Sequence, residues 1–346
     1  MFILAPIRHR LFRISPDETK FDRRGFPRAD PVVQHHLETA GRNFIDGYNA
    51  ALAKPQAGEL AAVLSKVDAM YRGFAFEGAA MALALLDLVT PWNRRRWQRF
   101  AASPAGDAHL YMLHVGAGWA AARHPWAKRN FARTIERYHP LYRWLLLDGF
   151  GFHEGFFRAG EYVGARAAPS RLSRHAARVF DQGLGRSMWF SQGADSERIA
   201  AAIWAFPASR HEDLWSGVGL AASYAGGVER GRLEELRSRA ADYGPHLAQG
   251  AAFAAKARQR AGNLVPHTEL ASDVFCRLPA DQAAAVTDEC LRDLPADGAE
   301  PAYQVWRARI SERFGGGKEK TSHERDAAQV PVSPWRNSQE ARRFPD

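Results

Sequence analysis

A short motif, in which a mostly polar residue precedes a glycine and small residues follow, recurs along the chain. Its glycines are Gly78, Gly116, Gly155, Gly183, Gly217 and Gly250, in the segments FEGAAMA, HVGAGWA, HEGFFRA, QGLGRSM, SGVGLAA and QGAAFAA. Most of the sequence separations between successive glycines lie in or near the range of roughly 33 to 47 residues, which is the length of a repeat of two helices and two turns. The spacing therefore predicts an all-α fold of stacked helical hairpins, an α-solenoid or an α/α-toroid-like repeat array.

Signals for helix ends support this fold class. Asp30 can cap a helix that begins at Pro31, because its carboxylate accepts hydrogen bonds from free amides and proline fits the first helical position. Thr90 and Pro91 repeat the signal before an expected helix over residues 92–100. Strand patterns are scarce. We expect a basic N-terminal arm over residues 1–29, a helical repeat domain over 30–314 and a disordered tail over 315–346, where apolar residues become few.

Charge and hydropathy exclude some classes of function. The formal net charge is +9, but no zinc-finger spacing, RNP motif or long basic run accompanies it, so nucleic acid is not an expected partner. The first residues, MFILAPIRHR, have the wrong order and length for a secretory signal. No uninterrupted apolar run approaches the roughly 20 residues of a spanning helix. A cytoplasmic protein with no membrane span is expected.

Familiar cofactor and catalytic motifs are absent or have a simpler explanation. GxGxxA patterns begin at Gly116 and Gly217, but they coincide with the repeat glycines, so helix packing explains them better than a pyrophosphate loop. No GxxxxGK[ST], GxSxG or HExxH pattern occurs. Cys276 and Cys290 are too few for a disulfide framework or a structural zinc site, and we expect both to be reduced and at least partly buried. No metal site is predicted and no cofactor is identified.

If the repeats superpose, the residue before each glycine occupies an equivalent position. These residues are Glu77, Val115, Glu154, Gln182, Ser216 and Gln249. A polar side chain on so tightly packed a helix is expected to face an inner groove or channel. Glu77 and Glu154 can then converge as paired carboxylates, one acid and one base. Alternatively, each caps a neighbouring helix or pairs with an arginine inside the array.

Further candidates for chemistry lie in and around the central segment LYRWLLLDGFGFHEG. With the two glutamates, the predicted catalytic set is Glu77, Asp148, His153, Glu154, Asp181 and Arg186. His153 and Glu154 are adjacent on one expected helix and point about 100° apart, which disfavours their binding one metal ion together.

A second set of residues is predicted to bind a ligand. It comprises His114, Trp119, Phe152, Gln182, Ser216, Gln249 and Lys256. Aromatic residues cluster beside the repeat glycines, where they either pack the core or form an apolar groove suited to a long hydrocarbon. His114 lines that groove or is a hydrogen-bonded core histidine. Lys256 binds an anion or a buried ion-pair partner, or it lies at the surface.

Seven blocks of the sequence carry a resemblance. They are RGFAFEGAAMALALLD, YMLHVGAGWAAAR, DGFGFHEGFF, FDQGLGRS, DLWSGVGLAASYAGG, HLAQGAAFAAKARQRAGN and HTELA. Over about residues 8–314 the chain resembles the UnbL-like family of enediyne biosynthetic clusters, which is domain-of-unknown-function family 1702. That family has no assigned catalytic residues, so the resemblance implies a context only. The implied context is a cytoplasmic accessory protein that acts near an iterative polyketide synthase, and that synthase makes a linear polyene.

Two hypotheses of different class follow. In the first, an enzyme binds a polyene or other lipid-like intermediate in an aromatic groove and uses the predicted catalytic set for acid/base chemistry. In the second, the helical array is a scaffold or carrier that holds pathway proteins or the polyene without reacting it. Polar pre-glycine residues that converge in a closed pocket favour the enzyme, and residues spread along an open charged face favour the scaffold. The enzyme is slightly preferred, because buried Asp, Glu and His are costly unless paired or used.

Overall fold

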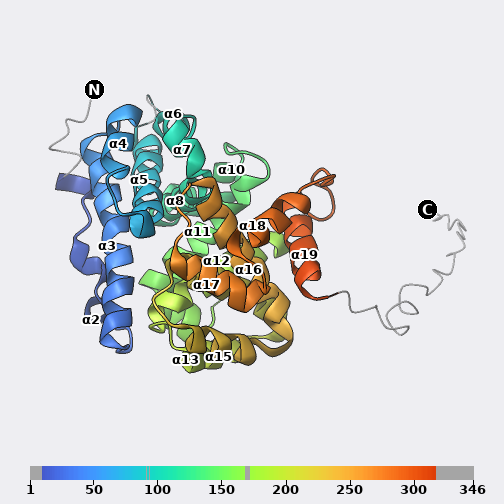
Figure 1. Cartoon of the computed structure of the whole chain (residues 1–346). Coiled ribbons are helices and arrows are strands. Elements are labelled where there is room, and N and C mark those ends of the chain that lie inside the picture. The colour runs from blue at the N-terminus through green and yellow to red at the C-terminus, as the bar shows by residue number, and fades with distance from the viewer. Residues whose placement is uncertain (1–9, 91, 93, 168–171, 317–346) are drawn as a thin grey trace, which may run out of the picture.

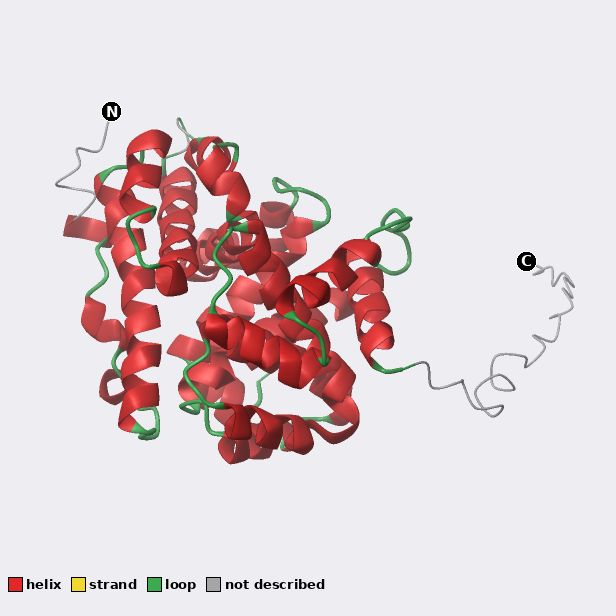
Figure 2. Cartoon of the chain, viewed as in Figure 1, coloured by secondary structure: helices red, strands yellow, loops and turns green. Residues whose placement is uncertain are grey.

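The computed structural model describes residues 10–90, 92, 94–167 and 172–316, and every regular element within these ranges is a helix (Figures 1 and 2). The expectation of an all-α protein is therefore confirmed. The predicted tail lies outside the described residues except for Gly315 and Gly316, and so do the first nine residues of the predicted arm.

Seven helices, which we call the core helices, carry most of the buried side chains. They are α3 (Pro31–Ala53), α5 (Ala69–Val89), α8 (Leu110–Arg123), α11 (Leu145–Phe157), α12 (Arg174–Ser191), α14 (His211–Ala225) and α16 (Gly244–Arg260). Each core helix packs against the next one along the chain. In Figure 1, α3 lies along one edge of the molecule, and α11, α12 and α16 lie near its centre.

Shorter helices connect the core helices or flank them. Before α16 these are η1 (Pro16–Thr19), α2 (Phe21–Arg24), α4 (Ala57–Leu64), α6 (Arg96–Ala101), α7 (Pro104–Ala108), α9 (Pro125–Arg129), α10 (Phe131–Ile135), η2 (Tyr142–Trp144), η3 (Gly160–Gly164), α13 (Ser196–Trp204), η4 (Ala208–Arg210), α15 (Arg230–Ala240) and η5 (Ala241–Tyr243). After α16 follow α17 (Pro266–Cys276), α18 (Ala280–Glu289) and α19 (Ala302–Phe314). Cys276 and Cys290 are free and buried, as expected.

The core helices approach one another most closely at glycines. A Cβ atom added to Gly78, Gly116, Gly149, Gly183, Gly217 or Gly250 would lie 1.8–2.1 Å from a backbone carbonyl oxygen of the preceding core helix. No real Cβ comes so near, so only glycine fits unless the backbones separate. The recurrent glycines are therefore packing positions, which confirms that the GxGxxA patterns at Gly116 and Gly217 mark helix contacts.

A second small residue stands two positions after each of these glycines. A Cβ on Gly118, Gly151, Gly185 or Gly219 would lie 1.9–2.1 Å from a carbonyl oxygen of the following core helix. Two residues along an α-helix turn the side-chain direction by roughly 200°. A Gly-x-Gly pair therefore lets one helix touch its two neighbours on nearly opposite sides.

The repeat position in α11 is Gly149, and the prediction of Gly155 at this place is wrong. A Cβ on Gly149 would lie 2.0 Å from the carbonyl oxygen of Val115, as the pattern requires, whereas the nearest atoms to Gly155 belong to the side chains of Ser187 and Leu184. With Gly149 in the series, every step from Gly116 to Gly250 is nearly equal, at about 33 or 34 residues, which is a usual period for helical-hairpin repeats. The unequal steps on either side of Gly155 came from the wrong glycine.

Early and late core helices touch one another. Arg258 of α16 is fully buried and donates to the carbonyl oxygens of Met70 in α5 and Tyr224 in α14, at 2.9 and 2.5 Å. Nε2 of His36 in α3 lies 2.6 Å from the carbonyl oxygen of Ala225. These contacts bring the first turns of α5 against the ends of α14 and α16. Side chains on the inner faces of α5, α12 and α14 are thereby enclosed together.

One predicted helix start is displaced. Asp30 caps α3 as expected and accepts hydrogen bonds from the amides of residues 32 and 33. Thr90, however, ends α5, and the next helix begins at Arg96, while Pro91 lies outside the described residues. The Asp87 carboxylate accepts from the backbone amides of Arg96 and Trp97, at 3.2 and 3.0 Å. A side chain of the preceding helix thus caps α6, which no local pattern reveals.

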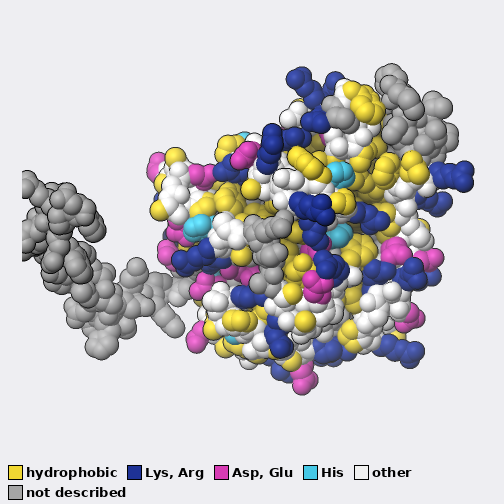
Figure 3. All heavy atoms as spheres, turned by 180° about the vertical axis from the view of Figure 1, so that it is seen from behind, with side chains coloured by type: hydrophobic (Ala, Val, Ile, Leu, Met, Phe, Trp, Pro, Cys, Tyr) yellow, Lys and Arg dark blue, Asp and Glu magenta, His cyan; other side chains and the backbone are white. Residues whose placement is uncertain are grey.

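The surface is mixed in charge on the face that Figure 3 shows. Lys and Arg side chains there are interspersed with Asp, Glu and hydrophobic side chains. Within the described residues, no helix has the length and apolar character needed to cross a bilayer.

Replacement of a packing glycine should destabilise the fold strongly. We expect Gly219→Ala to lower the free energy of unfolding by about 2 kcal/mol or more, because its Cβ would lie 2.0 Å from the Leu247 carbonyl oxygen. The matched control is Gly58→Ala in α4, where an added Cβ meets nothing within 4 Å. There the helix propensity of alanine should stabilise the protein by up to about 1 kcal/mol. Urea denaturation followed by circular dichroism measures both, and equal midpoints for the two variants would contradict the packing role.

Candidate functional site

The corrected register places a row of polar side chains inside the molecule. The residues that precede the packing glycines are Glu77, Val115, Asp148, Gln182, Ser216 and Gln249, and all of them are buried. Asp148 therefore takes the place that was predicted for Glu154. Both belonged to the predicted catalytic set, but only Asp148 stands at a repeat position.

Hydrogen bonds link four members of this row. Nε2 of Gln182 donates to Oδ2 of Asp148 at 2.7 Å, and Oγ of Ser216 donates to Oε1 of Gln249 at 2.6 Å. A longer contact of 3.4 Å joins Ser216 to Oε1 of Gln182. Tyr303 of α19 adds its hydroxyl 3.4 Å from Nε2 of Gln182. The row is thus a continuous buried network across α11, α12, α14 and α16.

Arg186 connects this network to Glu77. It lies one helical turn after Gln182, so both side chains project from the same face of α12. Its Nη1 donates to Oδ1 of Asp148, and its Nη2 lies 4.0 Å from Oε2 of Glu77. Its guanidinium carbon stands 4.8 Å from the ring centroid of Phe152. One buried guanidinium therefore stands between two carboxyl groups, and it is hydrogen-bonded to only one of them.

Glu77 has an ion pair with Arg186 at 4.0 Å but is the carboxyl group of this cluster without a hydrogen bond among the described residues. Its side chain is fully buried, and neither oxygen accepts a hydrogen bond from any residue that the structure describes. Burial raises the pKa of Glu77 from 4.5 to about 7, Arg186 opposes the rise, Asp148 adds to it, and the indole of Trp119 opposes it weakly. A carboxyl group with this pKa can both give and take a proton near neutral pH.

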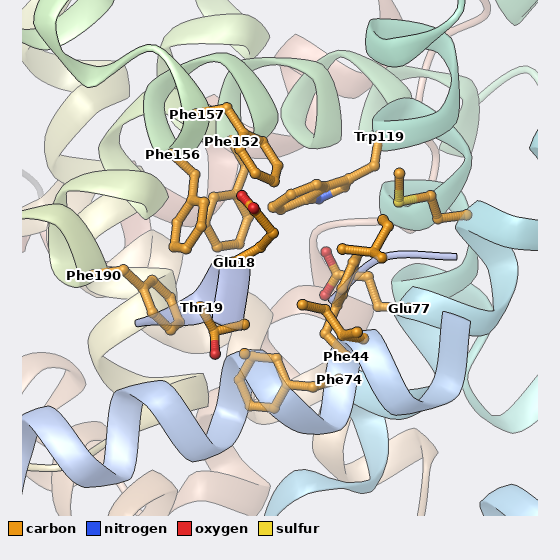
Figure 4. A pocket seen from close by; sticks show the side chains of 14 residues that line it. Glu18, Thr19, Phe44, Phe74, Glu77, Trp119, Phe152, Phe156, Phe157 and Phe190 are labelled. Carbon is orange, nitrogen blue, oxygen red and sulfur yellow. The ribbon is translucent and has the colours of Figure 1, made fainter. Parts of the chain in front are cut away.

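The Glu77 carboxyl faces a pocket walled by aromatic rings, which we call the aromatic pocket (Figure 4). Its cavity volume is about 50 Å³. The lining residues are Ile14, Glu18, Thr19, Gly41, Phe44, Ile45, Phe74, Glu77, Met81, Trp119, Phe152, Phe156, Phe157 and Phe190. Figure 4 shows the indole nitrogen of Trp119 on the side of Glu77, with the Phe152, Phe156 and Phe157 rings beyond it. The pocket is a nearly apolar space whose lining includes two carboxyl groups, those of Glu18 and Glu77.

The N-terminal arm closes one side of the aromatic pocket. The backbone amide and carbonyl of Ile14 are both hydrogen-bonded to the Asn49 side chain of α3, at 3.2 and 3.0 Å. A Cβ on Gly41 of α3 would lie 2.9 Å from the Thr19 methyl group, so glycine lets the arm approach α3 closely. Ile14, Glu18 and Thr19 consequently reach the pocket from outside the core helices.

Glu154 and His153 belong to a different environment from Glu77. Glu154 accepts hydrogen bonds from Nζ of Lys128 and Nη1 of Arg158, at 2.9 and 2.8 Å, and lies 3.1 Å from Nδ1 of His153. Burial raises the pKa of Glu154, but hydrogen bonds from His153 and Lys128 outweigh it and lower the pKa to about 2. Burial lowers the pKa of His153, and Glu154 opposes this. The predicted pairing of Glu77 with Glu154 is wrong, because Glu154 already has cationic partners and stands outside the repeat register.

Asp181, His114 and Lys256 also have partners of their own. Asp181 forms two hydrogen bonds with Arg210, and burial raises its pKa to about 6 although Arg210 opposes the rise. Nδ1 of His114 lies 2.8 Å from the Leu110 carbonyl oxygen, which makes it the hydrogen-bonded core histidine of the alternative interpretation. Nζ of Lys256 donates to Asp288 at 2.6 Å. None of these three side chains lines the aromatic pocket.

The sequence held a signal that identifies the correct register. Each repeat has a small residue two positions after its glycine, in EGAA, VGAG, DGFG, QGLG, SGVG and QGAA. The segment EGFF around Gly155 breaks this rule, because Phe157 occupies that position. Tyr224 and Tyr303, which approach the same cluster, carry no such pattern and were missed.

One comparison with known proteins gives a match. The model of a family described as "Protein of unknown function (DUF1702)" matches residues 3–314. No curated protein and no solved structure matches the chain. Among the described residues, no group of three or more His, Cys, Asp or Glu side chains is placed to hold a metal ion.

The raised pKa of Glu77 predicts a fall in stability as the pH rises. The folded protein keeps the Glu77 proton up to about pH 7, whereas the unfolded chain releases it near 4.5. Between these values the free energy of unfolding should drop by roughly 3 kcal/mol in the native protein but not in Glu77→Gln. Urea denaturation at about pH 5 and about pH 8 tests this. Parallel pH profiles of the two proteins would contradict it.

Glu154 serves as the control of opposite sign. Its pKa is lowered to about 2, so its contribution to stability is present above its ordinary pKa of 4.5 and is lost as the pH falls toward 2. We expect Glu154→Gln to be about 2 kcal/mol less stable than the native protein at neutral pH, with a difference that shrinks in acid. A Glu154→Gln variant as stable as the native protein at neutral pH would show that its ion pairs contribute nothing.

Proposed function

Since the chain belongs to the DUF1702 family, a family of unknown function, its activity has to be inferred from the site, and we propose that it is an enzyme. In this proposal the aromatic pocket binds a hydrophobic polyene intermediate, and Glu77 performs acid/base chemistry on it. The observation that carries the proposal is a fully buried carboxyl group without a hydrogen-bond partner among the described residues, in the wall of an apolar pocket.

The energetic argument rests on the cost of that arrangement. A buried polar group without a partner costs about 1–3 kcal/mol, and an isolated buried charge costs far more. Asp148 avoids this cost through Gln182 and Arg186, whereas Glu77 avoids only part of it by holding its proton. A strongly perturbed carboxyl group at a pocket is a candidate for function on physical grounds.

The aromatic lining supports a flat, conjugated ligand. Trp119 and Phe152 meet edge to face at 5.0 Å between ring centroids, and Phe152 and Phe190 are tilted at 5.4 Å. Rings at varied angles offer both faces and edges to a planar π system. A saturated chain needs no such lining, since aliphatic side chains would serve it equally well.

The proposed reaction is a proton shift within the conjugated chain. Protonated Glu77 donates its proton to one carbon of the polyene, and the Glu77 carboxylate then removes a proton from another position. The product is an isomer, so no oxidant, reductant or second substrate is consumed. Arg186 stabilises the carboxylate formed between the two steps, and Asp148 holds Arg186 in place.

The biological context is also part of the proposal. The resemblance to the enediyne-associated UnbL-like family suggests a cytoplasmic accessory protein of enediyne or related antibiotic biosynthesis, whose substrate comes from a polyketide synthase. We further infer that the core helices form an α/α-toroid-like array. The nearly equal steps between packing glycines from Gly116 to Gly250 and the contacts between α5 and α16 support this arrangement.

The second candidate is a scaffold or carrier that holds pathway proteins. It would be favoured by polar repeat residues along an open charged face. Instead, the polar pre-glycine residues are buried, with at most 1% of each residue exposed, and the face in Figure 3 carries mixed charge. These observations support the enzyme over the scaffold.

Deuterium exchange tests the proposed chemistry. A linear conjugated polyene ketone in heavy water should take up deuterium along its chain when the native protein is present, and Glu77→Gln should lower the rate by about 100-fold or more. Mass spectrometry measures the uptake, and quenching of tryptophan fluorescence measures binding separately.

The control for folding is Glu154→Gln, which should retain exchange because Glu154 lies outside the aromatic pocket. If the native protein bound the polyene but catalysed no deuterium exchange, the carrier hypothesis would replace the enzyme proposal. A folded protein that binds no polyene but retains pathway proteins in a pull-down would replace the enzyme proposal by the scaffold.

A further inference from the structure

A second pocket lies on the other side of Arg186. Its cavity volume is about 40 Å³. The lining residues are Tyr111, Met112, Val115, Leu145, Asp148, Arg186, Leu220, Tyr224, Phe253, Lys256, Ala257 and Trp306. Apart from the ionic and tyrosine side chains these residues are apolar, and they come from five core helices and α19. The second pocket thus offers another hydrophobic space that the proposed reaction does not use.

The two pockets share a wall of side chains. Arg186 lines the second pocket, yet its guanidinium contacts Phe152 and lies 4.0 Å from Glu77, both of which line the aromatic pocket. Tyr224 lines the second pocket, and its ring centroid lies 5.3 Å from that of Phe74 in the aromatic pocket. These contacts join side chains, so the wall between the two spaces is made of side chains rather than backbone.

Two hydrogen-bond donors in this wall have no partner among the described residues. They are Nε of Arg186 and the hydroxyl of Tyr224, and both side chains are buried, at 3% and 2% exposure. A Cβ on Gly73 would lie 1.7 Å from the Tyr224 hydroxyl, which places that oxygen against α5 one helical turn before Glu77. Buried donors are rarely left unsatisfied in native proteins. An oxygen atom of a ligand at this wall would accept from them.

The charge of the wall indicates what kind of oxygen fits. Asp148 already neutralises the Arg186 guanidinium through a direct hydrogen bond. An added carboxylate or phosphate would leave an uncompensated buried negative charge, which is costly. A neutral carbonyl or hydroxyl oxygen accepts hydrogen bonds without that cost.

We propose that the aromatic pocket and the second pocket are the two arms of one site for a linear apolar chain that carries a neutral carbonyl or hydroxyl group partway along its length. The oxygen lies at Arg186 and Tyr224, with one arm of the chain in each pocket. This inference rests on the proposed function, since it specifies the substrate class for the same Glu77 site. Each cavity is small, at about 50 and 40 Å³, so a chain that is too long for either one alone needs both.

The position of the carbonyl along the chain provides the test. Two linear ketones of equal length are compared, one with its carbonyl at mid-chain and one with a terminal methyl ketone, and binding is measured by tryptophan fluorescence. We expect the mid-chain ketone to bind about tenfold more tightly, because only it fills both arms while its oxygen reaches the wall.

Two variants test the second pocket and the Tyr224 hydroxyl separately. Ala257→Leu narrows the second pocket. It should weaken binding of the mid-chain ketone about tenfold and leave the affinity for the methyl ketone almost unchanged. Ala201→Leu, at an exposed site of α13, is the matched control and should change neither. Tyr224→Phe keeps the ring but removes the hydroxyl, and it should weaken both ketones about fivefold relative to a hydrocarbon of equal length.

The outcomes distinguish this inference from the proposed function. Equal affinities for the two ketones, together with no effect of Ala257→Leu, would overturn the two-armed site, while Glu77-dependent exchange would still support the aromatic pocket alone. If the folded native protein bound neither ketone nor polyene, both proposals would fail.

Discussion

The close approach of helix backbones at glycine is the constraint on which the rest of the structure depends. At each packing glycine a carbonyl oxygen of the neighbouring helix occupies the space that a Cβ would need. Helices this close leave no room for side chains between them at that level. The residue before each packing glycine is buried in the interior. Apart from Val115 these residues are polar, so the repeat that packs the helices also lines the interior with hydrogen-bonding groups.

In this arrangement two buried carboxyl groups, those of Asp148 and Glu77, differ in their hydrogen bonds. Asp148 accepts hydrogen bonds from Gln182 and Arg186, whereas Glu77 accepts none from the described residues and lies 4.0 Å from the same guanidinium. Burial therefore raises the pKa of Glu77 to about 7, although the Arg186 charge opposes the rise. The aromatic pocket lies on one side of this cluster and the second pocket on the other. An available proton, a fixed cation and two apolar spaces thus meet at one place.

The predicted site residues divide according to whether they stand in the repeat register or beside it. Glu77, Gln182, Ser216 and Gln249 were identified from the motif and are buried together with Asp148 and Arg186. Trp119 and Phe152 line the aromatic pocket. Glu154 was wrongly paired with Glu77, because HEG resembles the motif although it lacks the second small residue. Asp181 and Lys256 were also predicted as site residues, and each forms an ion pair outside the aromatic pocket.

The sequence by itself determined the helical class, the positions of most packing glycines and the polar residues that precede them. These features recur at nearly equal steps over most of the array, and each contact joins neighbouring repeats, so a local pattern is enough to encode them. Only the tertiary structure decided that α5 meets α12, α14 and α16, that Arg186 binds Asp148 rather than Glu77, and that Tyr224 and Tyr303 approach the cluster. The physical reason is that these contacts join helices far apart in the sequence. They depend on how all the helices between them pack, and no single segment specifies them.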